Sequence, residues 1–193
     1  MAGNRVIGAA SLPLIGCIAL IAAAVCQVIA FACANWGYDK TRVLYVGLWR
    51  DGNCLKSDHR ECFRRDHVEY FAEDWLKAVR GLECLALIFL SFPLVTLPIY
   101  MYIALGLYYR CMLGTMALCS LISAVCCLAG VVVYGIQITS MDWDTSWCLY
   151  VAIVGAAGAF IAFLVLIVAT ITKRPEKVRR VEKVRMYTIY ADE

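Results

Sequence analysis

The sequence predicts an all-α transmembrane protein with four membrane-spanning helices, and two observations lead to this fold class. Hydrophobic residues make up 63% of the chain and charged residues only 17%, whereas a soluble domain has about 45–50% apolar and about 25% charged residues. Charged side chains are also absent from four long windows, which are Val6–Tyr38, Cys84–Tyr109, Cys111–Met141 and Thr145–Thr172. A helix crosses a bilayer with about 20 apolar residues. Each window is therefore long enough for one span and too short for two.

These windows set the predicted organisation of the chain. Helices satisfy their own backbone hydrogen bonds in lipid, and the short alternating segments typical of a membrane β-barrel are missing. The predicted spans are residues 7–32, 82–105, 113–136 and 149–171. They make residues 1–172 one four-span domain with extracellular loops at 33–81 and 137–148, followed by a basic cytosolic tail at 173–193.

The distribution of Lys and Arg predicts the orientation. Lys173–Arg185 holds seven basic and two acidic residues, and cytoplasmic segments near spans carry an excess of positive charge. The first loop also contains many basic residues, but acidic residues balance them, and long loops translocate largely regardless of charge. We therefore expect a multi-pass plasma-membrane protein with both termini in the cytosol.

The cysteines divide by predicted compartment. Cys54 and Cys62 lie deep in the first extracellular loop, where an oxidising environment favours a disulfide, and closing this short ring is worth about 2.6 kcal/mol. Zinc bound with His59 and His67 is a weaker alternative, because the two-residue cysteine spacing of many zinc sites is absent. Cys111 lies beside the cytosolic turn and is a candidate for palmitoylation. Cys33 and Cys148 lie at the outer interface without an evident partner, and the remaining cysteines are expected to pack within spans.

The first extracellular loop contains two local patterns. Thr41–Val46 alternates and is rich in β-branched and aromatic residues, which predicts a strand. Asp51-Gly52 is a turn signal. From Val68 to Leu82 apolar residues recur at intervals of three and four, which predicts an amphipathic helix leading into the second span.

The chain resembles the claudin superfamily, which includes claudins, peripheral myelin and epithelial membrane proteins, and channel gamma subunits. The resemblance rests on Trp36, then Gly47-Leu48-Trp49, then Cys54 and Cys62, in a four-span protein. Asp74–Arg80 resembles the segment that enters the family's second span, with Arg80 at the position of a recurring arginine. Leu128-Ala129-Gly130 and Trp147–Tyr150 resemble stretches of the third and fourth spans.

This resemblance implies a left-handed four-helix bundle with a small extracellular β-sheet in the first loop. It also implies a Cys54–Cys62 disulfide and a Trp49 side chain anchored near the membrane surface, where tryptophan is favoured. The short second extracellular loop differs from that of barrier claudins. It favours the myelin and epithelial membrane branch or a divergent claudin-like member.

Two further groups of charged residues have predicted roles. Glu83 lies one helical turn after Arg80, so we expect an internal ion pair between them. The tail carries Lys177, Arg179, Arg180, Lys183 and Arg185, which can bind anionic lipid at about 1 kcal/mol per charge near the surface. A solvated tail that only fixes the orientation explains the same residues equally well.

The sequence contains no phosphate-binding glycine loop and no paired nucleophile and base, so we expect neither an enzyme nor a cofactor, metal or nucleic-acid site. The expected partners are membrane lipids and other membrane proteins. Two functions remain. The first is a cell–cell contact protein that assembles laterally and presents its stapled loop to neighbours. The alternative is an auxiliary subunit that alters the trafficking or gating of a channel or receptor.

Overall fold

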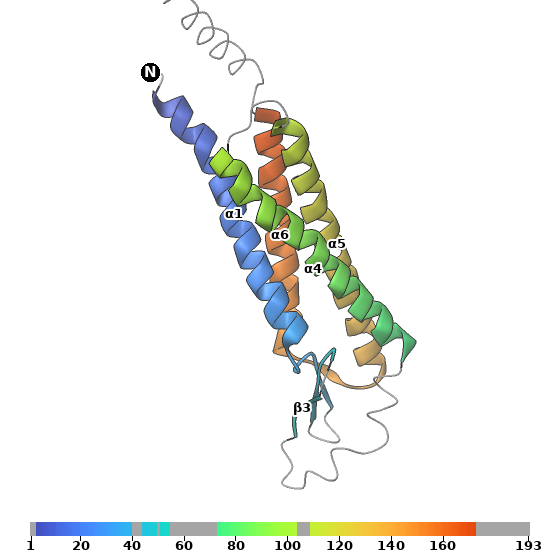
Figure 1. Ribbon diagram of the computed structural model, residues 1–193. Helices are drawn as coiled ribbons and strands as arrows, with labels where there is room; N and C mark the ends of the chain where they lie inside the picture. The colour runs from blue at the N-terminus through green and yellow to red at the C-terminus, as the bar shows by residue number, and fades with distance from the viewer. Residues whose placement is uncertain (1–2, 40–43, 50, 55–72, 104–108, 173–193) are drawn as a thin grey trace, which may run out of the picture.

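The predicted fold, a bundle of four long helices with a small sheet at one end, is confirmed. The computed structural model describes residues 3–39, 44–49, 51–54, 73–103 and 109–172. Its helices are α1 (Gly3–Ala32), α4 (Asp74–Ile103), α5 (Tyr109–Ser140) and α6 (Trp147–Thr172). Figure 1 shows α1 running from the end of the bundle opposite the sheet towards the sheet.

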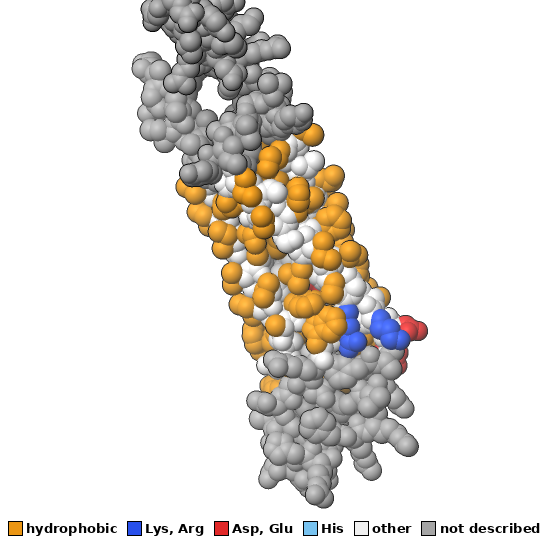
Figure 2. All heavy atoms as spheres, in the orientation of Figure 1, with side chains coloured by type: hydrophobic (Ala, Val, Ile, Leu, Met, Phe, Trp, Pro, Cys, Tyr) orange, Lys and Arg blue, Asp and Glu red, His pale blue; other side chains and the backbone are white. Residues whose placement is uncertain are grey.

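All four helices are long and apolar enough to cross a membrane. The qualifying stretches are Leu14–Ala32, Asp74–Ile99, Cys111–Ser140 and Trp147–Thr172. Large hydrophobic side chains are exposed along every helix, among them Ile18, Ile88, Val125 and Val154. Figure 2 shows hydrophobic side chains spread over the described middle of one face. A soluble protein does not expose apolar surface on this scale, whereas lipid solvates it.

The helices extend further towards the sheet than the predicted spans. Helix α4 begins at Asp74 rather than near residue 82, and α5 continues to Ser140 rather than ending near residue 136. The reason is that buried side chains of these extra turns, such as Leu76, Val79 and Ile138, pack under the sheet. The predicted amphipathic helix before the second span is therefore present from Asp74 onwards, and its first residues, up to 72, lie outside the described residues.

The sheet has four described strands in the order β3-β2-β1-β4. They are β1 (Gly37–Asp39), β2 (Leu44–Val46), β3 (Asp51–Cys54) and β4 (Asp144–Thr145), and every pairing is antiparallel. The strand predicted at Thr41–Val46 is present over its described part. The sequence did not predict β4, which comes from the connection between α5 and α6 and joins that connection to the first loop.

The turn predicted at Asp51-Gly52 is wrong, because these residues belong to β3. The chain leaves β2 after Val46, which pairs with Asp51 across a register shift. Between these strands Leu48 is fully buried in the bundle. The reversal therefore occurs around Leu48, where an apolar side chain is drawn into the core.

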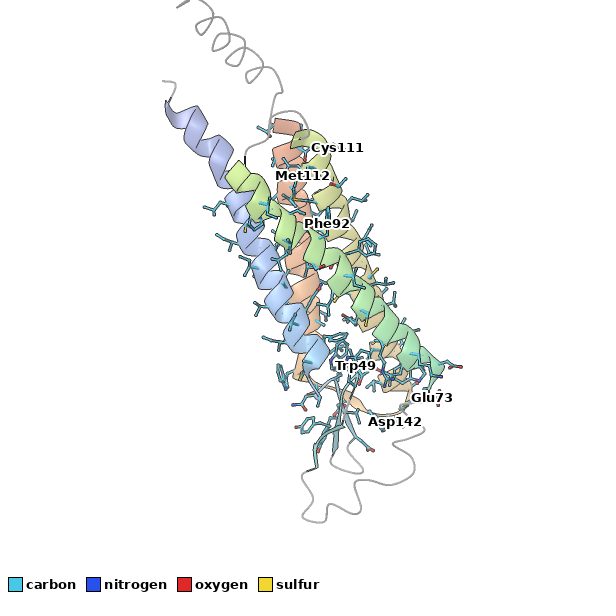
Figure 3. The ribbon with its side chains drawn as sticks, in the orientation of Figure 1. Trp49, Glu73, Phe92, Cys111, Met112 and Asp142 are labelled. Atoms are coloured by element: carbon cyan, nitrogen blue, oxygen red, sulfur yellow. A yellow bond between two sulfur atoms is a disulfide. The ribbon has the colours of Figure 1, made fainter. Side chains whose placement is uncertain are left out.

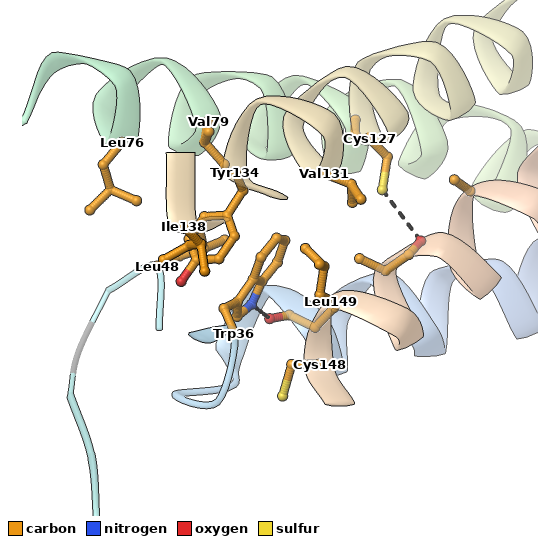
Figure 4. Packing of buried hydrophobic residues seen from close by; sticks show 14 of the residues in the cluster. Trp36, Leu48, Leu76, Val79, Cys127, Val131, Tyr134, Ile138, Cys148 and Leu149 are labelled. Atoms are coloured by element: carbon orange, nitrogen blue, oxygen red, sulfur yellow. Dashed lines mark hydrogen bonds between the residues drawn. The ribbon is translucent and has the colours of Figure 1, made fainter. Parts of the chain in front are cut away.

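Two clusters of buried side chains fill the bundle. The cluster at the sheet end joins sheet and helices and includes Trp36, Val46, Leu48, Tyr134 and Leu149, several of which are seen in Figure 4. The cluster in the other half is built from leucine, alanine and methionine side chains of all four helices. Only the first cluster contains residues of the sheet, so it determines how the sheet sits on the bundle.

Gly47 is required by a close approach between the sheet and the end of α1. A Cβ atom at this position would lie 2.6 Å from both the Cα atom of Ala34 and the carbonyl oxygen of Cys33. Both neighbours are backbone atoms, which cannot move aside as a flexible side chain does. A larger residue at position 47 therefore separates the sheet from the helix.

We expect Gly47→Ala to lower the stability of the folded protein by about 1–3 kcal/mol, the usual cost of overpacking. Gly81→Ala is the matched control, since a Cβ there meets nothing within 4 Å and alanine favours a helix by up to about 1 kcal/mol. Thermal unfolding of the purified protein in detergent measures both variants. Equal midpoints for Gly47→Ala and the unsubstituted protein would contradict the close approach.

Candidate functional site

The residues singled out in the sequence meet where the sheet joins the bundle, and we call this region the sheet–bundle junction. It comprises Trp36, Gly47, Leu48, Trp49 and Arg80. The first four come from the segments that flank β1 and β2, and Arg80 comes from the second turn of α4. The structure thus brings together residues that are far apart in the sequence.

Trp36 is the centre of the junction. Its side chain is fully buried, and its indole Nε1 donates a hydrogen bond to the carbonyl oxygen of Ala30 at 2.6 Å. That carbonyl lies in the last turn of α1, and it also accepts the backbone N–H of Cys33 at 3.3 Å. The ring also meets Tyr134 of α5 edge-on, with centroids 5.1 Å apart. Figure 4 shows this arrangement.

The backbone of Trp36 joins the first outer loop to the connection between α5 and α6. Its N–H donates to the carbonyl oxygen of Val46 at 2.9 Å, and its carbonyl oxygen accepts from the N–H of Ser146 at 2.9 Å. The N–H of Cys148 donates to the carbonyl oxygen of Asn35 at 3.3 Å. One short segment therefore holds β2 and the start of α6 together.

Arg80 fixes the chain reversal after β2. Its Nε donates to the carbonyl oxygen of Leu48 at 2.6 Å, and its guanidinium carbon lies 5.3 Å from the centre of the Trp49 ring. This is a cation–π contact. Trp49 also packs on Phe31 of α1, with centroids 5.1 Å apart. Arg80 thereby connects the start of α4 to the reversal and, through Trp49, to the end of α1.

Trp49 itself is 47% exposed. It lies at the sheet end of the bundle, as labelled in Figure 3. An indole at such a position presents an apolar face to lipid and an N–H group to water. The anchoring of Trp49 near the membrane surface, which the resemblance implied, stays a prediction.

The expected ion pair between Arg80 and Glu83 is not formed. Arg80 contacts Leu48 and Trp49 instead, and the Oε1 atom of Glu83 has no hydrogen-bond partner among the described residues. Glu83 is 2% exposed and packs against the backbone of Gly130 on α5. The two side chains are one turn apart, but they point to different neighbours.

A disulfide joins Cys33 at the end of α1 to Cys148 at the start of α6. The expectation that these cysteines lack a partner is therefore wrong. Their Cα atoms are 6.4 Å apart although 115 residues separate them in the sequence. The sequence feature that could have indicated this disulfide is the shared position of the two cysteines. Each lies at the outer end of a span, and both belong to the same predicted compartment. The pairing could not be predicted from the separation in sequence, because α1 and α6 become neighbours only in the folded bundle.

The other predicted site residues are covered only in part. Cys54 is the last residue of β3, whereas Cys62 lies outside the described residues, so their disulfide stays a prediction. Cys111 is exposed near the start of α5. Lys177, Arg179, Arg180, Lys183 and Arg185 lie outside the part of the chain that the structure covers. Among the described residues no group of three or more His, Cys, Asp and Glu side chains can hold a metal ion; His59 and His67 are outside this range.

Comparison with known proteins agrees with this geometry. The model of the PMP-22/EMP/MP20/Claudin family matches residues 10–172. This range contains most of α1, the whole sheet and the other three helices. No curated protein matches the chain.

We expect Cys33→Ser and Cys148→Ser to lower the unfolding midpoint equally, and the double variant to match the single ones, because each removes the same bond. Loop-closure entropy sets an upper limit of about 5 kcal/mol for a ring of this length, and inserted helices reduce that value. Mass spectrometry of the unreduced, digested protein should recover the linked pair of peptides. Cys84→Ser is the control, since Cys84 is a free, half-buried cysteine. Recovery of Cys33 and Cys148 as free thiols would contradict the bond.

Arg80→Met should cost about 1.5–3 kcal/mol, the range for a hydrogen bond to a charged group, and Arg80→Lys should recover part of it. Lys77→Met, one turn earlier, should cost less than about 1 kcal/mol, because the ion pair between Lys77 and Asp74 is exposed. The measurement is unfolding in detergent. Equal losses from Arg80→Met and Lys77→Met would show that Arg80 acts only as a surface charge.

Proposed function

The chain belongs to the PMP-22/EMP/MP20/Claudin family, and from that premise we propose that it is a plasma-membrane protein of cell–cell contacts. It assembles side by side with other copies in the bilayer and presents its first outer loop to neighbouring molecules. The family consists of non-enzymatic membrane proteins, and we assign this chain no catalytic role.

The orientation follows from the disulfide and the tail. A Cys33–Cys148 bond persists in an oxidising compartment, which supports an orientation with the sheet outside the cell. In this orientation the tail after α6 is cytosolic, which agrees with its excess of Lys and Arg. The exposed Cys111 is at the cytosolic end of α5 in this orientation, within reach of acylating enzymes, and the tail can bind anionic lipid.

The observation that carries the proposal is the attachment of the sheet to the bundle. Trp36 bonds to α1 and Arg80 of α4 bonds to Leu48, while the Cys33–Cys148 disulfide joins the ends of α1 and α6. The described sheet is therefore held in a fixed orientation relative to the helices, which repeated contacts between neighbouring molecules need. β3 and β4 form the two edges of the described sheet, and edge strands offer backbone groups for pairing.

A second candidate, an auxiliary subunit of a channel or receptor, is favoured by one feature. Helix α5 ends at Ser140 and α6 begins at Trp147, so the second outer connection is too short to reach far from the membrane. This limits contacts across the gap between cells and favours partners in the same bilayer. The alternative uses the same orientation and the same attachment of the sheet.

Expression of the full chain in cells that do not adhere to one another distinguishes the contact function from the auxiliary-subunit function. The contact function predicts cell aggregation and intramembrane strands in freeze-fracture images. Copurification with a pore-forming subunit at fixed stoichiometry, without aggregation, would instead support the auxiliary role and overturn the first proposal.

Within this experiment, Cys54→Ser or Cys62→Ser should lower surface delivery several-fold and reduce aggregation in proportion, because the outer loop loses its expected disulfide. Cys84→Ser, a change within α4, should leave both unchanged. Surface biotinylation and flow cytometry give the two readouts. Normal surface levels in both loop variants would rule out a Cys54–Cys62 bond that matters for folding.

A further inference from the structure

The exposed surface of α4 carries a regular order of chemical groups, starting at the sheet end. Acidic side chains come first, at Glu73 just before the helix and at Asp74 in its first turn. Basic side chains follow at Lys77 and Arg80, and then comes Gly81. Large exposed apolar side chains continue along the helix, and they are Leu85, Ile88, Phe92, Val95 and Ile99. Figure 2 shows acidic and basic side chains beside hydrophobic ones at this end of the molecule.

Several of these residues share one face of the helix. Steps of four and seven residues return to nearly the same side of an α-helix, so Lys77, Gly81 and Ile88 lie in line, and Val95 continues the line. Ile88 and Val95 are 62% and 60% exposed, and a Cβ atom on Gly81 would meet nothing within 4 Å. Arg80 lies beside Lys77, three residues further along. The face is therefore open, with basic side chains near one end and apolar surface at the other.

The apolar part of this face sets the level of the membrane surface. Lipid chains cover the exposed side chains from Leu85 onwards, and Lys77 lies about 12 Å from Leu85 along the helix axis. The polar headgroup layer is about 5–7 Å thick on each side of the hydrocarbon core. With Gly81 near the edge of the core, Lys77 lies in the headgroup layer, where a long basic side chain places its charge. Asp74 lies about one turn further out.

The order of groups along α4 matches the order in a zwitterionic phospholipid. Such a lipid carries its ammonium group outermost, its phosphate below it, and its acyl chains in the core. The phosphate accepts charge-assisted hydrogen bonds from Lys77 and Arg80, and the ammonium group lies opposite Asp74. A lipid with only negative charge leaves Asp74 without a cation, and a sterol or inorganic phosphate matches only one part of the face.

The ion pair already present on this face does not prevent lipid binding. Nζ of Lys77 lies 2.8 Å from Oδ1 of Asp74, and the two side chains are 59% and 96% exposed. An exposed ion pair contributes less than about 1 kcal/mol. A zwitterionic headgroup can therefore replace it at little cost, because it offers each side chain a group of opposite charge. Arg80 keeps its contacts with Leu48 and Trp49, which hold its side chain at the edge of this face.

We propose that this face of α4 is a binding site for a zwitterionic phospholipid. Lys77 and Arg80 bind the phosphate, Asp74 faces the ammonium group, and an acyl chain lies along the helix from Gly81 to Val95. The site does not depend on the proposed function, since it rests only on the exposed surface of α4.

Two photoreactive lipids with identical diazirine-bearing acyl chains test the site, one with a phosphocholine and one with a phosphoglycerol headgroup. The full chain is reconstituted in nanodiscs of mixed phosphatidylcholine and phosphatidylglycerol that contain a trace of one probe. After illumination, mass spectrometry of the peptides measures the labelling of α4 relative to that of α6. Helix α6 is the internal reference, because it exposes apolar side chains to lipid and contains no charged residue.

We expect the ratio of α4 to α6 labelling to be about threefold higher for the choline probe than for the glycerol probe, the size expected of exposed charge contacts. Lys77→Gln should lower the ratio for both probes, whereas Lys77→Arg should preserve it. Asp74→Asn should lower the ratio for the choline probe and raise it for the glycerol probe. These variants remain folded, because the exposed ion pair contributes little to stability.

Equal ratios for the two probes, unchanged by Lys77→Gln and Asp74→Asn, would show unselective lipid around the bundle and overturn the proposal. Inorganic phosphate that abolishes the preference at constant ionic strength would assign the basic residues to a free anion, and this result would overturn it as well. Neither outcome affects cell aggregation, so the proposed function is tested separately.

Discussion

The indole of Trp36 is the contact on which the rest of the outer structure depends. A tryptophan N–H that is buried needs an acceptor, and the last turn of a helix has carbonyl groups without a helical donor. The Trp36 indole finds its acceptor in the Ala30 carbonyl, which it shares with the N–H of Cys33. Because the same residue pairs through its backbone with Val46 and Ser146, the end of α1, the sheet and the start of α6 are fixed relative to one another.

The fold could be predicted because each helix that crosses lipid needs about 20 consecutive apolar residues. Charge-free windows long enough to span a bilayer are visible without any knowledge of tertiary contacts, and all four helices are where these windows lie. The residues of the sheet–bundle junction could also be identified, since Trp36, Gly47-Leu48-Trp49 and Arg80 form a recognisable pattern. Their types carry the information, because an indole, a glycine and a guanidinium are needed for particular contacts.

Contacts between distant segments could not be predicted in this way. Arg80 was expected to pair with Glu83, its neighbour along the helix, but a backbone carbonyl from the chain reversal lies closer in space. Strand β4 has only two residues and exists because it pairs with β1. Gln27 is a polar residue inside the first charge-free window. Only the packing of α1 on α6 shows that it is enclosed, and that Gly155 makes room for it.

The bond between Cys33 and Cys148 has a consequence for biosynthesis. In the orientation proposed above, Cys33 enters the oxidising lumen when the first span is inserted, and its partner follows 115 residues later. Cys54 and Cys62 reach the same compartment in the interval. A premature bond between Cys33 and either of them has to be reopened by thiol–disulfide exchange before the correct one forms. Export of the finished molecule therefore waits for translation of the last helix, and nascent chains that stop short of it keep a reactive thiol that resident oxidoreductases can retain.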